Sequence, residues 1–178
     1  MEVNTYIALF RGINIGGHHL LPMKELAGIF GRMGFQQVKT YIQSGNVVFQ
    51  SAPIDKNKIA REISSRVLKS YGFAPTVLLL EVSELQEAID NNPFSTTDGK
   101  ALHFFFLESH PPNPDLEGLL AIKLKSEEFK LCNKIFYLYA PEGVGRSKLA
   151  LKVEKGLGVP ATGRNWNTVR ELISLAGR

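Results

Sequence analysis

Apolar positions in the first half of the chain follow two kinds of pattern, which predict strands and helices in turn. Residues 5–11 (TYIALFR) form an almost continuous apolar run, which is typical of a buried strand. After Pro22, apolar side chains recur at helical spacing as far as Gly34, a residue type that often ends helices. The first half is therefore predicted to contain, in order, a strand at 5–11, a helix between Pro22 and Gly34, a hairpin at 38–50, a helix between Pro53 and Gly72, a strand at 76–82, and a short helix that Ser83 and Gln86 cap and that ends before Pro93.

After a polar stretch at 95–100 (STTDGK), the same order of elements begins again. The second half is predicted to contain a strand at 102–108, a short helix at 115–122, a hairpin at 129–139, a helix at 145–157, and a last helix after the 159–167 loop, in which Ala161 and Thr162 can supply a short fourth strand. Each half then follows the βαββαβ order of ferredoxin-like units. The predicted fold class is α+β with duplicated ferredoxin-like subdomains and antiparallel sheets. Residues 1–178 would form one domain with subdomains 1–92 and 93–178, the second ending in the C-terminal helix.

Three of the predicted strands lack the alternation of apolar and polar residues that a half-exposed antiparallel sheet requires. The runs YIALF, VLLL and FFFL are uninterrupted. We therefore expect both faces of these strands to be covered. Helices would cover one face, and the other half of the chain or a second copy would cover the other, so a homodimer is one partner to consider.

Composition limits the class of protein and its compartment. The 178 residues are 44% apolar and 21% charged, which suits a globular chain with a sizeable core. The one cysteine, Cys132, cannot form an internal disulfide, and the N-terminus lacks the basic region of a signal peptide. No stretch reaches the ~18 apolar residues of a membrane span. We expect a cytoplasmic protein with no membrane partner.

Positive charge is concentrated toward the C-terminus. Residues 144–178 contain seven Lys and Arg against two acidic residues, while the whole chain carries a net +4. This distribution favours an anionic partner at that end of the chain. A solvated helix face with a basic tail explains the same charges.

Three polar segments are candidate ligand-binding sites. The glycine-rich loop after the first strand can offer backbone N–H groups and a helix N-terminus to a phosphate or carboxylate, although it matches neither a dinucleotide-binding nor a P-loop sequence. A structural turn is the alternative for this loop, and ordinary turn chemistry is the alternative for the hairpin tip. The candidate ligand-binding residues are Arg11, Gly12, Asn14, Gly16 and Gly17 in the first segment, Gln43, Ser44 and Asn46 at the hairpin tip, and Arg164, Asn165 and Asn167 in the third segment.

The third segment has more polar residues than a helix start requires. Asn165 or Asn167 can cap the last helix, and a cap needs only one of them. Arg164 can hold an oxyanion through two N–H groups. Trp166 can stack on a ring of a ligand or pack into the core.

No pattern identifies a catalytic acid, base or nucleophile, so whether the protein is an enzyme stays open. His18 and His19 are adjacent and have no Cys or His partner at metal-binding spacing. Cys132 lies in an apolar hairpin without a nucleophile signature. We therefore predict neither a metal site nor a cofactor.

The sequence motifs RGINIGG, TYIQSGNVVF and RNWNTV, in this order, resemble those of the bacterial family called domain of unknown function 1697 (DUF 1697). The resemblance extends over residues 5–175 and implies an α+β fold with two ferredoxin-like subdomains. It implies no established activity. The family motifs fall on the three candidate segments above, whereas His18 and His19 depart from a stretch that more commonly contains lysine.

Three hypotheses about function follow. In the first, the three segments converge to bind a small phosphate- or carboxylate-bearing ligand. In the second, they hold the two subdomains together in a structural or interaction protein. The third and weakest is an RNA-binding module, because the ferredoxin-like order occurs in RNA-recognition folds but the chain lacks an RNP1-like string and its strands lack an exposed stacking face.

Overall fold

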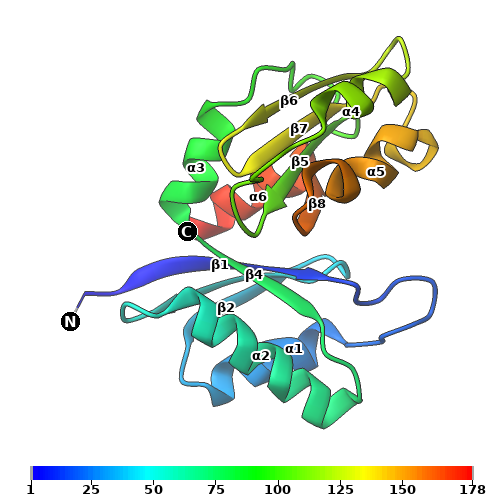
Figure 1. The fold of residues 1–178 in the computed structure, drawn as a ribbon. Helices are drawn as coiled ribbons and strands as arrows, with labels where there is room; N and C mark the ends of the chain where they lie inside the picture. Colours follow the sequence, from blue (N-terminus) through cyan, green and yellow to red (C-terminus); the bar gives the residue numbers. More distant parts are fainter. Residues whose placement is uncertain (1, 178) are drawn as a thin grey trace. The chain divides into compact units, whose positions relative to one another are not determined.

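In the computed structural model, which describes residues 2–177, the first apolar run forms an interior strand of a four-stranded antiparallel sheet (Figure 1). The sheet has the strand order β2-β3-β1-β4, and all its neighbouring strands are antiparallel. Two helices, α1 and α2, cover one of its faces. The elements are β1 (Asn4–Arg11), α1 (Met23–Arg32), β2 (Gln36–Tyr41), β3 (Asn46–Ser51), α2 (Lys56–Tyr71) and β4 (Thr76–Glu81).

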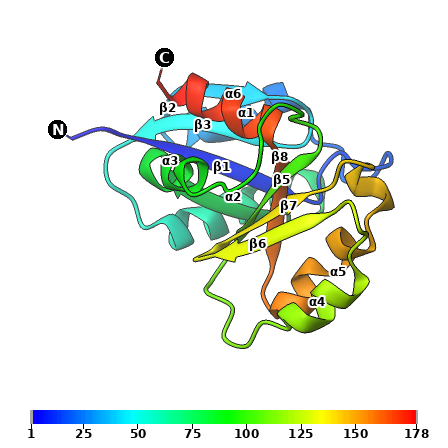
Figure 2. The same ribbon diagram turned by 90° about the horizontal axis from the view of Figure 1, so that it is seen from above.

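The second sheet repeats this order of elements and strands. It has the order β6-β7-β5-β8, again antiparallel throughout, and α4 and α5 pack side by side on one face (Figures 1 and 2). The elements are β5 (Leu102–Leu107), α4 (Leu116–Ile122), β6 (Glu128–Cys132), β7 (Ile135–Tyr139), a 3-10 turn at Val144–Arg146, α5 (Lys148–Leu157) and β8 (Ala161–Asn165). Within residues 2–177 the fold is thus a mixed α+β fold with two four-stranded antiparallel sheets and six α-helices, the remaining two being α3 (Val82–Asp90) and α6 (Trp166–Ala176).

The chain divides into two units. Unit 2 is Glu87–Arg170, and unit 1 combines the residues up to Gln86 with those from Glu171 onward. The divisions fall inside α3 and inside α6. In unit 1, the end of α6 lies against β2, because Lys39 Nζ donates a hydrogen bond to the Leu175 carbonyl (3.3 Å).

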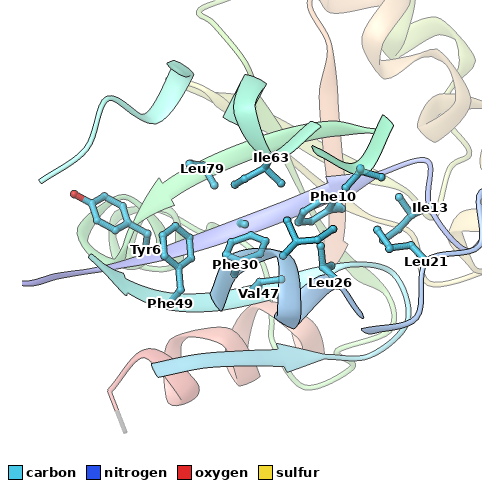
Figure 3. Packing of buried hydrophobic residues seen from close by; sticks show 13 residues of the cluster. Tyr6, Phe10, Ile13, Leu21, Leu26, Phe30, Val47, Phe49, Ile63 and Leu79 are labelled. Atoms are coloured by element: carbon cyan, nitrogen blue, oxygen red, sulfur yellow. The ribbon is translucent and has the colours of Figure 1, made fainter. Parts of the chain in front are cut away.

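The interior strands β1 and β5 are buried on both faces, as their unbroken apolar runs predict. On β1, Ile7 and Leu9 are as fully buried as their neighbours Ala8 and Phe10 on the opposite face. Only the second of these faces contacts α1 and α2, where Phe30 of α1 contacts the rings of several other aromatic residues (Figure 3). This face therefore holds the main core of unit 1.

Two expectations for unit 2 need correction. The predicted 145–157 helix begins only at Lys148, because the buried Ser147 hydroxyl accepts a hydrogen bond from the Ala150 N–H and caps it there. The short fourth strand predicted at Ala161 and Thr162 is present but longer, because β8 extends to Asn165 and pairs with β5 over its whole length. Gly163 on β8 lies opposite Phe105, and a β-carbon at Gly163 would sit 3.1 Å from that ring. The missing side chain leaves room for the phenyl ring.

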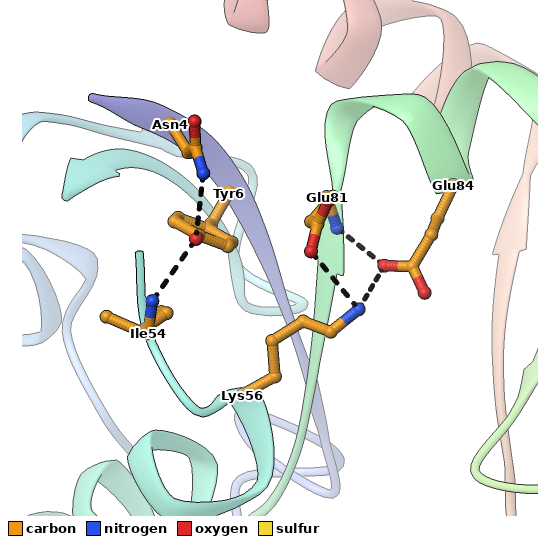
Figure 4. Close-up of polar contacts among 6 residues, drawn as sticks. All are labelled: Asn4, Tyr6, Ile54, Lys56, Glu81 and Glu84. Atoms are coloured by element: carbon orange, nitrogen blue, oxygen red, sulfur yellow. Dashed lines mark hydrogen bonds and ion pairs between the residues drawn. The ribbon is translucent and has the colours of Figure 1, made fainter. Parts of the chain in front are cut away.

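The predicted capping box of Ser83 and Gln86 is also wrong, because α3 begins at Val82. Glu84 supplies the cap instead: its Oε2 accepts a hydrogen bond from the Glu81 N–H (2.7 Å). Figure 4 shows that the same carboxylate pairs with Lys56 at the start of α2. Lys56 thus helps to hold the Glu84 carboxylate at the start of α3.

Replacing Phe30 with alanine is expected to destabilise unit 1 strongly. Phe30 is fully buried, and its ring centroid lies 5.1 Å from that of Phe49 and 6.2 Å from that of Phe10. We expect Phe30→Ala to lower the free energy of unfolding by about 3–5 kcal/mol in urea denaturation. Leu68→Ala on the exposed side of α2 is the control, with a change of about 1 kcal/mol or less. Equal losses in the two variants would contradict this assignment of the core.

His103 is expected to make the protein less stable in mild acid. Its Nε2–H donates to the Lys100 carbonyl (2.9 Å), and burial lowers the pKa of the His103 imidazole below its ordinary value. As pH falls below about 6.5, the unfolded chain binds a proton at this residue that the folded chain does not, so stability falls.

The melting temperature of His103→Gln should therefore decrease less between pH 6.5 and pH 5 than that of the parent protein. His110→Gln at an exposed position is the control and should keep the parent slope. An unchanged slope in His103→Gln would show that this histidine does not carry the effect.

Candidate functional site

The side chain of Asn14 joins two of the three predicted segments. Its Nδ2 donates to the carbonyls of Gln43 (2.8 Å) and Leu21 (2.9 Å), and its Oδ1 accepts from the Leu21 N–H (2.8 Å). Both N–H groups and the oxygen of the amide are thus used on backbone. We call residues 11–21 and 42–46, which this amide ties together, the loop cluster. It belongs entirely to unit 1.

The glycines of the first segment form a tight turn. The His18 N–H donates to the Ile15 carbonyl (2.9 Å), and the next pair is closed by Asn14 N–H and the His19 carbonyl (3.1 Å). Gly16 and Gly17 occupy the two central positions with φ of 57° and 78°. A positive φ at both positions defines a type I′ turn, which favours glycine. The segment is therefore a miniature hairpin with a fixed backbone.

The hairpin tip rests on the end of the core. Gly45 has a φ of 85°, its carbonyl accepts from the Phe10 N–H, and a β-carbon there would overlap Phe10 Cβ (2.5 Å) and Ile13 Cδ1 (2.6 Å). Figure 3 shows Ile13 beyond Phe10 at this end of the cluster. Asn46 is fully buried, and its Nδ2 donates to the Tyr41 carbonyl (2.9 Å) and to Ser44 Oγ (3.0 Å). The side chain of Asn46 thus stabilises the hairpin tip through these hydrogen bonds.

His19 makes two contacts that no pattern in the sequence predicts. Its Nδ1–H donates to the Gly12 carbonyl (2.8 Å), and its ring stacks on Phe73 at a centroid distance of 4.5 Å. Both contacts hold the second arm of the miniature hairpin. The partner Phe73 lies more than fifty residues further along the chain, so no local pattern in the sequence could have indicated this role.

The third segment lies in unit 2, at the junction of β8 and α6. Asn165 Oδ1 accepts a hydrogen bond from the Thr168 N–H (3.0 Å), so Asn165, rather than Asn167, caps α6. Asn167 packs against the 92–100 loop, where a β-carbon on Gly99 would lie 2.1 Å from its Oδ1. Trp166 stacks on Phe104 with centroids 5.9 Å apart, which places its ring in unit 2.

Arg164 is the most buried cation of the candidate set. Its guanidinium donates to the Gly163 carbonyl (2.9 Å), and burial lowers its pKa to about 10. The side chain therefore stays protonated at neutral pH. Arg164, Asn165 and Asn167 all have contacts within unit 2, and their convergence with the loop cluster stays a prediction.

Within residues 2–177, His, Cys, Asp and Glu side chains do not gather in groups of three or more that could hold a metal ion. Nor does any helix in that range combine the length and apolarity needed to cross a membrane.

Fold and loop motifs together describe a two-unit α+β protein, and comparison with known proteins identifies its family. The sequence profile of DUF1697, a family described as a protein of unknown function, matches residues 3–137, and the chain belongs to this family. The solved structure of the conserved bacterial protein SP0830 from Streptococcus pneumoniae aligns with a TM-score of 0.71 and 24% identity, over 98% of this chain and 99% of that chain. At this identity the likeness shows a shared fold. A comparison with curated proteins gives no match.

Two glycine substitutions separate backbone strain from overlap in the loop cluster. Gly17 and Gly45 have similar φ values (78° and 85°), but a β-carbon at Gly17 meets no atom within 4 Å. Gly17→Ala should lower the free energy of unfolding by about 1–2 kcal/mol from the left-handed backbone alone. Gly45→Ala should cost a further 1–3 kcal/mol, because Phe10 and Ile13 must move. Equal decreases in the free energy of unfolding, measured by chemical denaturation, would contradict the close packing of the hairpin tip against the core.

Proposed function

We propose that the protein binds a small phosphate- or carboxylate-bearing ligand at the loop cluster. The observation that carries the proposal is the state of the Gly16 and Gly17 amides. In the described residues, no hydrogen bond uses either N–H group, although the backbone around them is fixed by the type I′ turn and by Asn14. Peptide N–H groups held in a fixed loop suit an anion, because they need no reorganisation when it binds.

Local charge supports the same chemistry. Arg11 ends β1 at the base of the loop, and α1 begins just after it. The N-cap residue of α1 is Pro22, which makes no side-chain cap, so the first N–H groups of the helix have no capping side chain, while Glu25 in the first turn offsets part of the helix dipole. Gly12, Gln43 and Ser44 complete the polar surface of the proposed site.

A ligand-binding role for Arg164, Asn165 and Asn167 in unit 2 stays a prediction from the sequence motifs. Their present contacts are local to unit 2 and serve its structure as well. We also infer that the two units are ferredoxin-like and arose by duplication, since each has the same order of elements and of strands. A cytoplasmic location and a homodimer stay predictions.

A structural role is the second candidate, and the hydrogen bonds of Asn14 and Asn46 favour it. Both side-chain amides form hydrogen bonds with backbone atoms of the loop cluster. These two side chains therefore stabilise the protein without any ligand. In a purely structural protein, substitutions of the exposed residues in the cluster would change nothing that can be measured beyond stability.

Charge reversal at Gln43 tests the proposal. The parent protein is screened by thermal shift against inorganic phosphate, nucleoside monophosphates, sugar phosphates and dicarboxylates, and the affinity of each stabilising compound is then measured by calorimetry. We expect Gln43→Glu to weaken binding about five- to tenfold, because it places a negative charge beside the anion. The side chain of Gln43 is exposed, so the variant should fold normally.

Gln36→Glu is the matched control. Gln36 is also exposed but begins β2, about 16 Å along the strand from Tyr41, where salt screens its charge. An equal loss of affinity in both variants would move the site away from the loop cluster. Failure of every compound to stabilise the parent protein at millimolar concentration would refute ligand binding of this class and leave the structural role.

A further inference from the structure

Three large aliphatic side chains of the loop cluster point into solvent. Ile15 is 65% exposed, Leu20 is 62% exposed and Ile42 is 49% exposed. Aliphatic side chains of this size usually lose water contact on folding, and a group of them on an otherwise polar surface often marks a binding site. The loop that carries the glycine amides therefore also carries an apolar surface.

The hydrogen bonds of Asn14 bring together the backbone segments that carry these side chains. Ile15 follows Asn14, Leu20 precedes Leu21, and Ile42 precedes Gln43, and Asn14 is bonded to both Leu21 and Gln43. Each exposed residue is thus one peptide unit, about 3.8 Å, from a residue of this hydrogen-bonded group. All three residues therefore belong to the loop cluster, whose backbone these hydrogen bonds fix.

Ile42 has a backbone conformation that its side chain disfavours. Its φ is 47°, in the left-handed region where β-branched residues are strained and Gly or Asn is at ease. Its side chain is half exposed. The backbone conformation of the turn does not favour isoleucine at this position, and the side chain does not fill the core. Strain of this kind is concentrated at functional sites, which points to a role for the side chain outside the core.

We propose that the ligand of the loop cluster is an amphiphilic anion, in which a phosphate or carboxylate is attached to an apolar body such as an acyl chain. This inference rests on the proposed function and specifies its ligand class. The anionic group lies at the Gly16 and Gly17 amides, and the apolar body covers Ile15, Leu20 and Ile42. Binding removes the exposed aliphatic surface from water, so the affinity comes from both ends of the ligand.

A homologous ligand series tests this directly. Calorimetry compares inorganic phosphate with ethyl, butyl and hexyl phosphate, each kept monomeric. We expect the affinity to rise two- to fourfold per methylene, up to about 0.8 kcal/mol for each buried group. Equal affinity along the series would overturn the inference and leave the proposed function intact, whereas absence of binding by every phosphate and by matched carboxylates would overturn both.

Ile42→Asn separates a binding role from a structural one. Asparagine relieves the left-handed strain, so the melting temperature should stay level or rise, while the gain in affinity per methylene should fall by half or more. Leu68→Asn, at a similarly exposed position on α2, should leave the gain unchanged. A lower melting temperature for Ile42→Asn with an unchanged affinity series would overturn the role of Ile42.

A vesicle-binding experiment distinguishes an amphiphilic anion in a lipid membrane from a free one in solution. The parent protein is sedimented with vesicles of phosphatidylcholine alone and with vesicles that contain phosphatidic acid. Binding to the anionic vesicles, lost in Ile42→Asn, would assign the ligand to a lipid surface and support an amphiphilic anion. Binding of monomeric hexyl phosphate without vesicle binding would support a free amphiphile. Failure to bind either would overturn the inference.

Discussion

The loop cluster depends on one amide group. Asn14 bonds backbone atoms at two places, seven and twenty-nine residues further along the chain, and so joins the loop after β1 to the tip of the β2–β3 hairpin. The backbone groups of Leu21 and Gln43 that it bonds lie outside the helices and the two sheets, which therefore do not supply their partners. The side chain of Asn14 supplies those missing partners, and the turn at Gly16 and Gly17 and the surface around it keep their shape as a result.

Beneath this cluster, the core holds the loop in place. Phe10 and Ile13 lie on either side of the end of β1, and the bare backbone of Gly45 lies directly on both of them. The absence of a side chain at Gly45 is thus a packing requirement as well as a conformational one. Polar bonds above and close packing below restrain the same few residues. Such double restraint suits a site that must present exposed groups without collapsing onto them.

Much of the fold could be predicted from the sequence because its signals are local. Unbroken apolar runs predict β1 and β5 as buried strands, and glycine at the ends of α1 and α2 predicts where these helices stop. Strand β8 was only partly predictable: Ala161, Gly163 and Asn165 have little preference for strands, and pairing with β5 decides their conformation. The start of α3 was misplaced for a similar reason, since the carboxylate that caps it also pairs with Lys56, far away in the chain.

The candidate site was predictable in its residues but not in their roles. Gly16 and Gly17 are compatible with a ligand-binding loop and with a structural turn. The sequence does not show which backbone N–H groups lack a hydrogen-bond partner. The capping role of Asn165, which was one of two alternatives, depends on where α6 begins. The exposure of Ile15, Leu20 and Ile42 runs against the usual burial of such residues, so only coordinates could identify them as a surface.

The order of the two units along the chain has a consequence for synthesis. Unit 1 is discontinuous: its residues from Glu171 onward are made only after all of unit 2. The Leu175 carbonyl that Lys39 contacts therefore leaves the ribosome long after β2 does. During translation the residues of unit 1 up to Gln86 are therefore made first, and unit 2 can fold before the last residues of unit 1 are available.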